Sequence, residues 1–298
     1  MKINRILFPT DFSPCSEAAL STALFHAQVF EADLHILHIV VPGTADMREA
    51  FPEPETISQK LHEIAEVRMR ATVEKYQDEP FKIVEAVRAG TAAVPMVKRY
   101  ASEHGIDLIV MGTHGRTGFK HFLLGSVAEN IVRTSECPVV TVRAGENVPP
   151  VKSVDCIVAS VDFSDFSEAV LLTAIDLAQT HKAKLVLTHV IEEYFHPGGV
   201  DAAWTGLGDP MNSYREIREK QLTEYAAKAS EAGVPAYTKV LTGRAPAEIT
   251  KTAAEEKADL IVMGTHGYSG IEHLWLGSTT ERVVRISETP VFTIKINA

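Results

Sequence analysis

The sequence predicts an α/β protein built from two tandem, doubly wound, five-stranded parallel sheets. Apolar runs rich in Ile, Leu and Val alternate with helical patterns, as expected for parallel strands that helices cover on both faces. The whole series occurs twice, so that Asp11 returns as Asp162, and a linker rich in Gly, Pro and Asn lies at 144–152. We therefore expect one domain at 1–144 and a second at 153–298, each with strand order 3-2-1-4-5.

The elements of the first half follow from its apolar runs and its helix-start signals. A serine N-cap followed by proline favours a helix after Ser13, and Ser126 with Glu129 indicates a capping box at the last helix. Little polar alternation within the apolar runs favours buried strands. The expected strands are 3–9, 34–41, 82–88, 107–112 and 138–143, and the expected helices are 14–30, 56–77, 92–104 and 126–134.

The second half repeats these elements in the same order, and Ser278 with Glu281 repeats the expected capping box. The halves differ between their second strand and second helix, where the second half carries the longer, Gly-rich segment 192–213. Long loops of this kind are often lids or partner surfaces. A plain surface loop is the alternative, and both interpretations stay open at this stage.

The composition disfavours several classes of protein. The 298 residues carry 39 acidic against 29 basic side chains, and the net charge of −10 disfavours binding to nucleic-acid phosphates. The longest apolar runs fall well short of the roughly 20 residues that cross a membrane. The first residues lack the apolar core of a signal peptide, and three cysteines without a CxxC pair suit a reducing compartment. We expect a cytoplasmic protein that binds neither nucleic acid nor membrane.

One glycine motif, Gly-x2-Gly-x9-Gly-Ser, occurs in each half, at 112–126 and at 264–278. In the expected strand order the ligand crevice lies between strands 1 and 4, and both the motif and Asp11 fall at its rim. Glycine permits positive φ and close approach of the main chain, while a helix beginning at Ser126 attracts anions through its free N–H groups. These parts predict a phosphate cradle beside a carboxylate, which describes a mononucleotide site. Alternatively, the glycines only turn the chain and the serine only caps its helix.

These residues resemble the universal stress protein family in its tandem two-domain form, over nearly the whole chain. The resemblance is carried by "ILFPTDFS" with "GTHGRTGFKHFLLGS", and by "VASVDFS" with "GTHGYSGIEHLWLGS". The motif is similar to that of the family's ATP-binding branch. The resemblance thus implies an adenine nucleotide alpha hydrolase-like fold, a stress-response role, and ATP with Mg²⁺ on its phosphates. It also implies that the halves pair through their last strands as an intrachain pseudo-dimer, and a homodimer of the chain stays open.

The resemblance assigns nucleotide contacts to matching positions of both halves: the strand tips to ribose and base, the second strands to adenine, and the glycine motifs to phosphate. The expected binding residues are Pro9, Thr10, Asp11, Ile39, Gly112, Gly115, Arg116, Gly125, Ser126, Val127, Asp162, Val190, Gly264, Gly267, Gly277, Ser278 and Thr279. The second half departs from the pattern where Ser160 and Val161 replace Pro9 and Thr10, which changes the pocket wall. Tyr268 replaces Arg116, which favours tighter phosphate binding by the first half.

Fast catalysis is not predicted. His114 and His266 lie in the glycine loops, where a general acid would suit a phosphate, but a neutral donor or a solvent-facing ring is the simpler interpretation. Cys15, in the first turn of a helix, is more simply an apolar filler than a redox group. The pattern fixes no carboxylate pair near the phosphates and no zinc-ligand spacing. A nucleotide-dependent regulator is the leading hypothesis; a slow ATPase or phosphotransfer enzyme and a nucleotide-independent scaffold are the alternatives.

Overall fold

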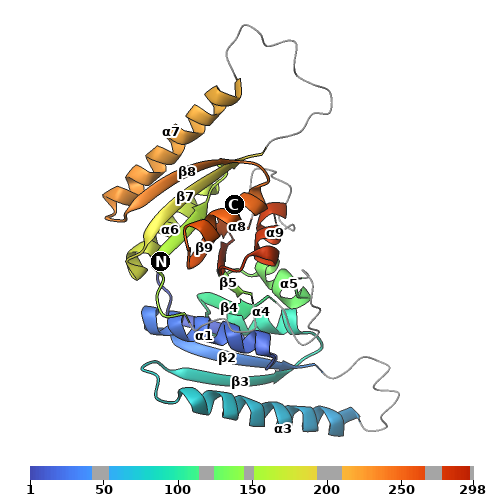
Figure 1. Cartoon of the computed structure of the whole chain (residues 1–298). Helices are drawn as coiled ribbons and strands as arrows, with labels where there is room; N and C mark the ends of the chain where they lie inside the picture. The colour runs from blue at the N-terminus through green and yellow to red at the C-terminus, as the bar shows by residue number, and fades with distance from the viewer. Residues whose placement is uncertain (42–53, 114–123, 144–150, 193–209, 266–276, 296–298) are drawn as a thin grey trace, which may run out of the picture. The chain divides into compact units, whose positions relative to one another are not determined.

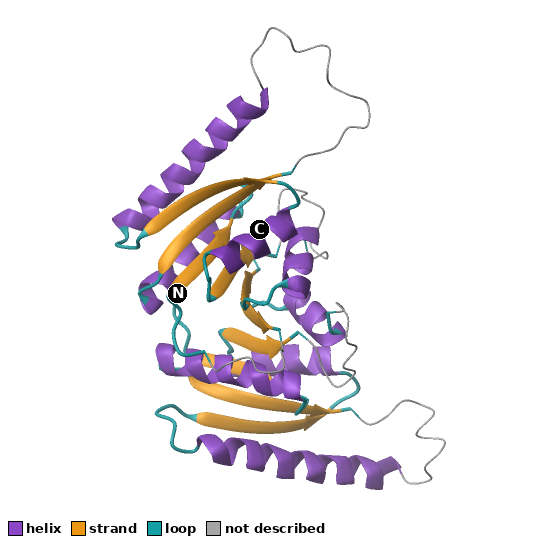
Figure 2. Cartoon of the chain, in the orientation of Figure 1, coloured by secondary structure: helices purple, strands orange, loops and turns teal. Residues whose placement is uncertain are grey.

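The structure is a computed structural model that describes residues 1–41, 54–113, 124–143, 151–192, 210–265 and 277–295. The chain divides into two compact units, one spanning Lys2–Lys152 and the other Ser153–Ala298 together with Met1. Each unit alternates strands with helices along the chain (Figure 2). Pairing of the units through their last strands stays a prediction.

The first unit contains a parallel sheet in the order β3-β2-β1-β4-β5, as predicted from the sequence. Because the order turns back at β1, right-handed crossovers distribute the helices over both faces of the sheet. In chain order the elements are β1 (Arg5–Pro9), α1 (Pro14–Phe30), β2 (Asp33–Val40), α3 (Pro54–Val73), the 3₁₀ turn η1 (Glu74–Tyr76), β3 (Ile83–Ala89), α4 (Ala93–His104), β4 (Leu108–Gly112), α5 (Ser126–Thr134) and β5 (Val139–Val142).

The second unit repeats this arrangement with the order β8-β7-β6-β9-β10. Figure 1 labels β8, β7 and β9 of this sheet. Its elements are β6 (Cys156–Ser160), α6 (Ser167–His181), β7 (Lys184–Ile191), α7 (Pro210–Glu231), β8 (Ala236–Thr242), α8 (Ala245–Glu255), β9 (Leu260–Gly264), α9 (Ser278–Ile286) and β10 (Val291–Ile294). The α/β class and the mostly parallel, doubly wound sheet predicted from the sequence are therefore confirmed.

The core of each unit lies along its central strands, which are apolar on both faces. Ile6, Leu7 and Phe8 of β1 are almost fully buried, and so are Ile157, Val158 and Ala159 at the equivalent positions of β6. Each large side chain of this kind contributes about 1.5–3 kcal/mol by leaving water. The same burial on both faces explains why the strands read as continuous apolar runs, and it fixes the strand tips on which the candidate site is built.

Candidate functional site

A gap opens between the two central strands of each sheet toward their carboxyl ends. In the first unit, β1 pairs with β4 only as far as Leu7 opposite Ile109. Beyond that point β1 continues alongside β2 to Pro9, while β4 continues alongside β5 to Gly112. The strands therefore diverge where the sheet order reverses, which is the position at which parallel α/β sheets bind ligands.

The second unit diverges in the same way, one residue later. Its β6 pairs with β9 through Ala159 opposite Val262, then follows β7 to Ser160, while β9 follows β10 to Gly264. Both halves thus place the residue after the first strand, and the first glycine of the motif, on opposite sides of the divergence.

The tip of β1 is organised by short polar side chains. The Asp11 carboxylate accepts a hydrogen bond from the Ser13 N–H at 3.0 Å through Oδ1. The Thr10 hydroxyl accepts from the Phe12 N–H at 3.0 Å and lies 2.6 Å from the Ser16 hydroxyl. Asp11 is only partly buried. The tip therefore holds a partly buried carboxylate close to the crevice, with the Ser13 N–H as a donor to its Oδ1 atom.

The tip of β6 holds its carboxylate with hydrogen bonds from two serines. Oδ1 of Asp162 accepts from the Ser164 N–H at 3.0 Å, from the Ser164 hydroxyl at 2.6 Å and from the Ser167 hydroxyl at 2.9 Å. Val161 stands at the position of Thr10 and supplies no hydroxyl. The second carboxylate consequently receives hydrogen bonds from two serine hydroxyls of its own loop.

A strained phenylalanine follows each aspartate, which the sequence analysis did not anticipate. Phe12 has a φ of 58° and Phe163 a φ of 59°, in the left-handed region that bulky residues rarely adopt. Each ring packs on a histidine of the second strand: Phe12 on His38 at 4.6 Å between ring centroids and Phe163 on His189 at 4.8 Å. The repeated Asp-Phe-Ser sequence was a usable signal, because Asp two residues before Ser is typical of an Asx turn.

The two histidines of the second strands form hydrogen bonds with the main chain just after β1 and β6. Nδ1 of His38 lies 2.7 Å from the carbonyl oxygen of Thr10, and Nδ1 of His189 lies 2.9 Å from that of Val161. Burial lowers the pKa of His189, and the nearby charge of Arg218 lowers it further. Both histidines are therefore hydrogen-bonded groups near the ends of their strands.

The helix that follows the glycine motif begins differently from the prediction. Gly125, not Ser126, is the N-cap of α5, and no side chain caps the helix. The capping box expected from Ser126 and Glu129 is therefore wrong. The reason lies in the main chain: the Gly125 N–H donates to the Thr113 carbonyl at 2.7 Å, which ties the helix start to the end of β4.

This start leaves the first N–H groups of α5 without an acceptor in the described part of the chain. The first helical bond runs from the Glu129 N–H to the Gly125 carbonyl at 2.9 Å, so the N–H groups of Ser126, Val127 and Ala128 precede it. Within the residues that the structure describes, these three groups have no acceptor, and the Ser126 side chain is exposed. A helix start of this kind attracts an anion.

The second unit builds the same helix start. Gly277 is the N-cap of α9 without a side-chain cap, so the capping box expected from Ser278 and Glu281 is also wrong. The Gly277 N–H donates to the Thr265 carbonyl at 2.8 Å, and the Thr280 hydroxyl donates to the Gly264 carbonyl at 2.7 Å. Ser278 is exposed, as Ser126 is in the first unit.

The backbone conformation does not explain why two of these positions are glycine. Gly125 has φ −62° and ψ 137°, and Gly277 has φ −55° and ψ 132°, values that any residue adopts. The positive φ proposed as one role for the motif glycines is not found at these two residues. What remains specific to glycine there is the missing Cβ, which permits a close approach to the main chain.

The other expected binding residues divide into two groups. Pro9, Ile39, Gly112, Val127, Val190, Gly264 and Thr279 are described and partly buried at the strand ends and helix starts. The second group, which lies outside the described residues, comprises Gly115, Arg116 and Gly267 with the loop residues His114, His266 and Tyr268. The structure brings the first group to the carboxyl edge of each sheet.

The cysteines and carboxylates of the described chain give no sign of redox or metal chemistry. Burial raises the pKa of the Cys15 thiol, and the Asp11 carboxylate raises it further, which opposes any lowering by the helix dipole. Cys15, Cys137 and Cys156 are free thiols. Among the described residues, no group of three or more His, Cys, Asp or Glu side chains is arranged to hold a metal.

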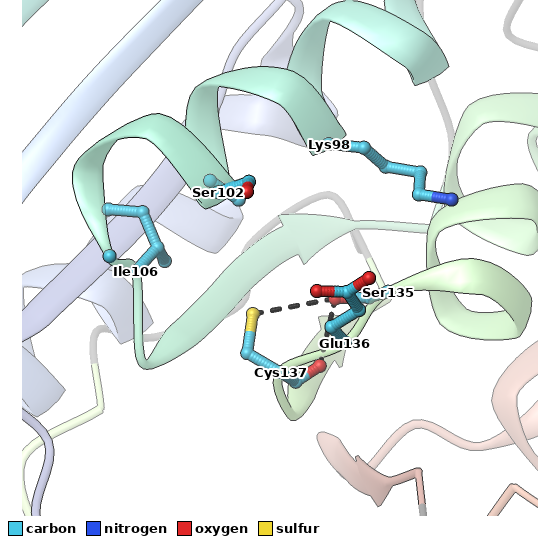
Figure 3. Close-up of a pocket in the computed structure, with 8 residues that line it drawn as sticks. Lys98, Ser102, Ile106, Ser135, Glu136 and Cys137 are labelled. Carbon is cyan, nitrogen blue, oxygen red and sulfur yellow. Dashed lines mark hydrogen bonds between the residues drawn. The ribbon is translucent and has the colours of Figure 1, made fainter. Parts of the chain in front are cut away.

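A cavity of about 320 Å³ lies elsewhere in the first unit (Figure 3). It is bounded by Ser102 at the end of α4, Ile106 before β4, and Ser135 and Cys137 before β5. These residues precede the strands, so the cavity lies at the amino ends of β4 and β5. It is therefore separate from the crevice at the carboxyl ends, where sheets of this class bind their ligands.

Comparison with known proteins gives consistent results for both halves. The model of the universal stress protein family matches residues 2–143 and again 154–295. Universal stress protein Rv2623 of Mycobacterium tuberculosis is 28% identical over 301 residues, covering 96% of this chain and 94% of its own. Universal stress protein MJ0577 of Methanocaldococcus jannaschii is 31% identical over 153 residues, covering 47% of this chain and 94% of its own.

A solved structure supports the fold over the whole length. A universal stress protein from Archaeoglobus fulgidus aligns with a TM-score of 0.71 at 23% identity, covering 98% of this chain and 96% of that one. In the described part of the present structure, every helix is too short or too polar to cross a bilayer. Since both halves match the family model over almost their full length, the chain belongs to the universal stress protein family.

Proposed function

We propose that this protein binds an adenine nucleotide, ATP in particular, in the crevice between β1 and β4 and its counterpart between β6 and β9. The observation that carries the proposal is the start of α5, where three consecutive N–H groups lack an acceptor among the described residues, beside diverging strands. The start of α9 repeats it. Such a helix start binds phosphate through its N–H groups and its dipole. We further propose that occupancy regulates the protein's partners, in keeping with a stress-response role.

We assign each part of the nucleotide to a different set of residues. Ser126 and Val127 donate main-chain N–H groups to phosphate oxygens, and the missing Cβ of Gly125 lets the phosphates approach. Asp11 accepts hydrogen bonds from the ribose hydroxyls, and the main chain of Thr10 and Ile39 borders the base. Mg²⁺ enters on the phosphates and keeps most of its waters. The second half assigns the same roles to its matching residues, Asp162, Val190, Gly264, Gly267, Gly277, Ser278 and Thr279.

Charge near the phosphates is the main objection to this assignment. Glu129 lies in the first turn of α5 and would repel a phosphate by about 0.5–2 kcal/mol at a separation of roughly 8 Å. Each hydrogen bond to a charged group contributes about 1.5–3 kcal/mol, so three main-chain donors outweigh one glutamate. In the second half, Arg285 pairs with Glu281 and reduces the repulsion there.

The experiment is titration of the purified chain with ATP, followed by calorimetry and by mass spectrometry of any nucleotide released from fresh protein. Saturable binding that Gly125→Val abolishes supports the proposal. Absence of bound nucleotide together with absence of heat on titration would point to a nucleotide-independent scaffold. ATP turnover that Gly115→Val abolishes would point to a slow ATPase.

Cellular placement and the domain bounds are proposals of the same kind. An acidic chain with three free thiols suits the cytoplasm. The proposed domains, 1–144 and 153–298, each contain a complete glycine motif. Expression of each domain alone, with a test for cooperative unfolding, checks these bounds.

A further inference from the structure

One cation of the second unit lies beside the tip of β6 without an anionic partner among the described residues. The guanidinium carbon of Arg218, on α7, lies 5.1 Å from the centre of the Phe163 ring and 4.7 Å from that of Tyr214. Its helix runs alongside β8 and packs against β7 and β8 (Figure 1). Stacking on two aromatic rings orients the planar guanidinium and leaves its edge to make hydrogen bonds.

The hydrogen bonds of Arg218 use only part of its capacity. One terminal nitrogen donates to Oε1 of Gln221 at 2.8 Å and the other to the Tyr214 hydroxyl at 2.7 Å. Nε is buried and lacks an acceptor within the described chain. A guanidinium carries five N–H groups, of which two are engaged and the one on Nε is buried, so the second N–H of each terminal nitrogen remains for a ligand. Both acceptors are neutral, and no described carboxylate forms an ion pair with Arg218.

The place of this side chain suggests which part of a ligand it would meet. Phe163 directly follows Asp162, the carboxylate proposed to bind ribose hydroxyls in the second half. The charges of Arg218 and Asp162 both act on His189, on which Phe163 packs. Arg218 therefore belongs to the ribose side of the crevice, whereas the start of α9 forms its phosphate side.

We infer that Arg218 binds a second phosphate carried on the ribose of the nucleotide; this inference rests on the proposed function. The second half then selects nucleotides with anionic groups at both ends, such as adenosine 3′,5′-bisphosphate or its 2′,5′ isomer. Guanidinium groups bind phosphate through paired N–H donors, which matches the unused edge of Arg218. Asp162 opposes the second phosphate, but its Oδ1 already receives three hydrogen bonds from Ser164 and Ser167.

The first half lacks this feature. Met69 of α3 and Leu222 of α7 are both buried and are taken as equivalent positions of the two halves. By this alignment, Ala65 is the residue of the first half that corresponds to Arg218. Ala65 is itself buried and carries no charge. The first half is thus expected to bind ATP without preference for a phosphate on the ribose.

The test uses the full chain with Gly125→Val, which silences the first site, and calorimetric titration with three ligands. ADP carries both of its phosphates on the 5′ oxygen of the ribose, whereas adenosine 3′,5′-bisphosphate carries one on the 3′ and one on the 5′ oxygen. AMP, with a single 5′ phosphate, is the reference. We expect the bisphosphate to bind about tenfold more tightly than ADP, the size expected for one charge-assisted hydrogen bond. Arg218→Gln should remove this preference and leave AMP binding unchanged within about twofold.

A matched control separates a binding role from a role in holding α7. Arg215 lies one turn earlier and bonds to the Val240 carbonyl at 3.2 Å and the Thr242 hydroxyl at 2.7 Å. Arg215→Gln removes the same charge and should keep the preference. Arg218→Met keeps the stacking without the charge and guards against misfolding, which thermal melting checks. Equal binding of ADP and bisphosphate, or a preference that survives in Arg218→Gln, overturns the inference. Failure of every adenine nucleotide to bind the unmutated chain would overturn the proposed function as well.

Discussion

The loops after β1 and β6 have the same backbone turn but stabilise it with different hydrogen bonds. The loop after β1 uses the Thr10 and Ser16 hydroxyls, and the Ser13 N–H donates to Oδ1 of Asp11. The loop after β6 lacks the threonine and uses the serine hydroxyls to hold Asp162 instead. Both halves thus share the strained phenylalanine and the histidine on which it packs, while serine hydroxyls hold the carboxylate in the second half.

The largest predicted effect comes from adding a side chain where each glycine motif meets its helix. Gly125→Val should weaken ATP binding by the first half about a hundredfold, roughly 2.7 kcal/mol, because the β-carbon and its methyl groups block the phosphates from the N–H groups of α5. Calorimetric titration with ATP measures the loss. Gly277→Val is the matched change, and its effect reports how much the second half is used.

Unchanged ATP affinity in a well-folded Gly125→Val protein would contradict the phosphate cradle. Valine is compatible with the φ of −62° at this position, so a fold defect is not expected from backbone strain. A circular dichroism melt on the same sample checks this.

The aspartates should respond in opposite ways to truncation. Asp11→Ala should lower ATP affinity about tenfold and cost about 1 kcal/mol of stability, since the Ser13 N–H loses its acceptor Oδ1. Asp162→Ala should cost about 2 kcal/mol, because three donors from Ser164 and Ser167 lose their acceptor. Urea unfolding gives the stabilities and calorimetry the affinities. Equal stability losses would show that the two loops are not organised differently.

Acid should weaken the second half through a histidine whose equivalent position in the first half is Phe30. Burial lowers the pKa of His181 to about 4, below the ordinary value of about 6.5. The unfolded chain therefore takes up a proton first, and stability is lost as the pH falls from about 6.5 to about 4. The full shift corresponds to about 3 kcal/mol, and partial exposure reduces our expectation to about 1–2 kcal/mol.

The change that tests this effect is His181→Phe, which copies the first half. Urea unfolding at pH 7 and at pH 4 should show a smaller loss in the variant than in the unmutated chain. An identical loss in both proteins would assign the acid sensitivity to other groups, among them His35, whose pKa burial also lowers.

The smallest predicted effect distinguishes a phosphate ligand from a helix cap. Ser126 does not cap α5, so Ser126→Ala should change stability by less than about 0.5 kcal/mol, against about 1 kcal/mol for a lost cap. ATP affinity should fall only a few-fold, because the main-chain donors remain. Ser278→Ala provides the comparison in the second half. A stability loss of the size expected for a cap would favour the structural role of the serine.

Much of the fold could be predicted because local signals and burial agree. Proline after Ser13 places the start of α1 at Pro14, and the apolar runs locate each strand to within about two residues of the observed bounds. The repeat doubles the information, since an element found in one half has a counterpart in the other.

The details of the site depend on contacts between distant residues, which local patterns do not contain. The start of α5 is set by the Gly125 N–H and the Thr113 carbonyl, so the serine that looked like a cap became the first helical residue. The positive φ of Phe12 depends on the turn that its neighbours make, not on its own preference. Arg218 could not be linked to Phe163 without knowing how α7 packs.

The most direct measurement of the central claim follows the amide signals of the two helix starts by NMR during titration of the ¹⁵N-labelled chain with ATP. The account predicts saturable shifts for Ser126, Val127 and Ala128, and shifts for Ser278 and Thr279 if the second half also fills. Binding of ATP that leaves all of these amides unmoved would contradict it.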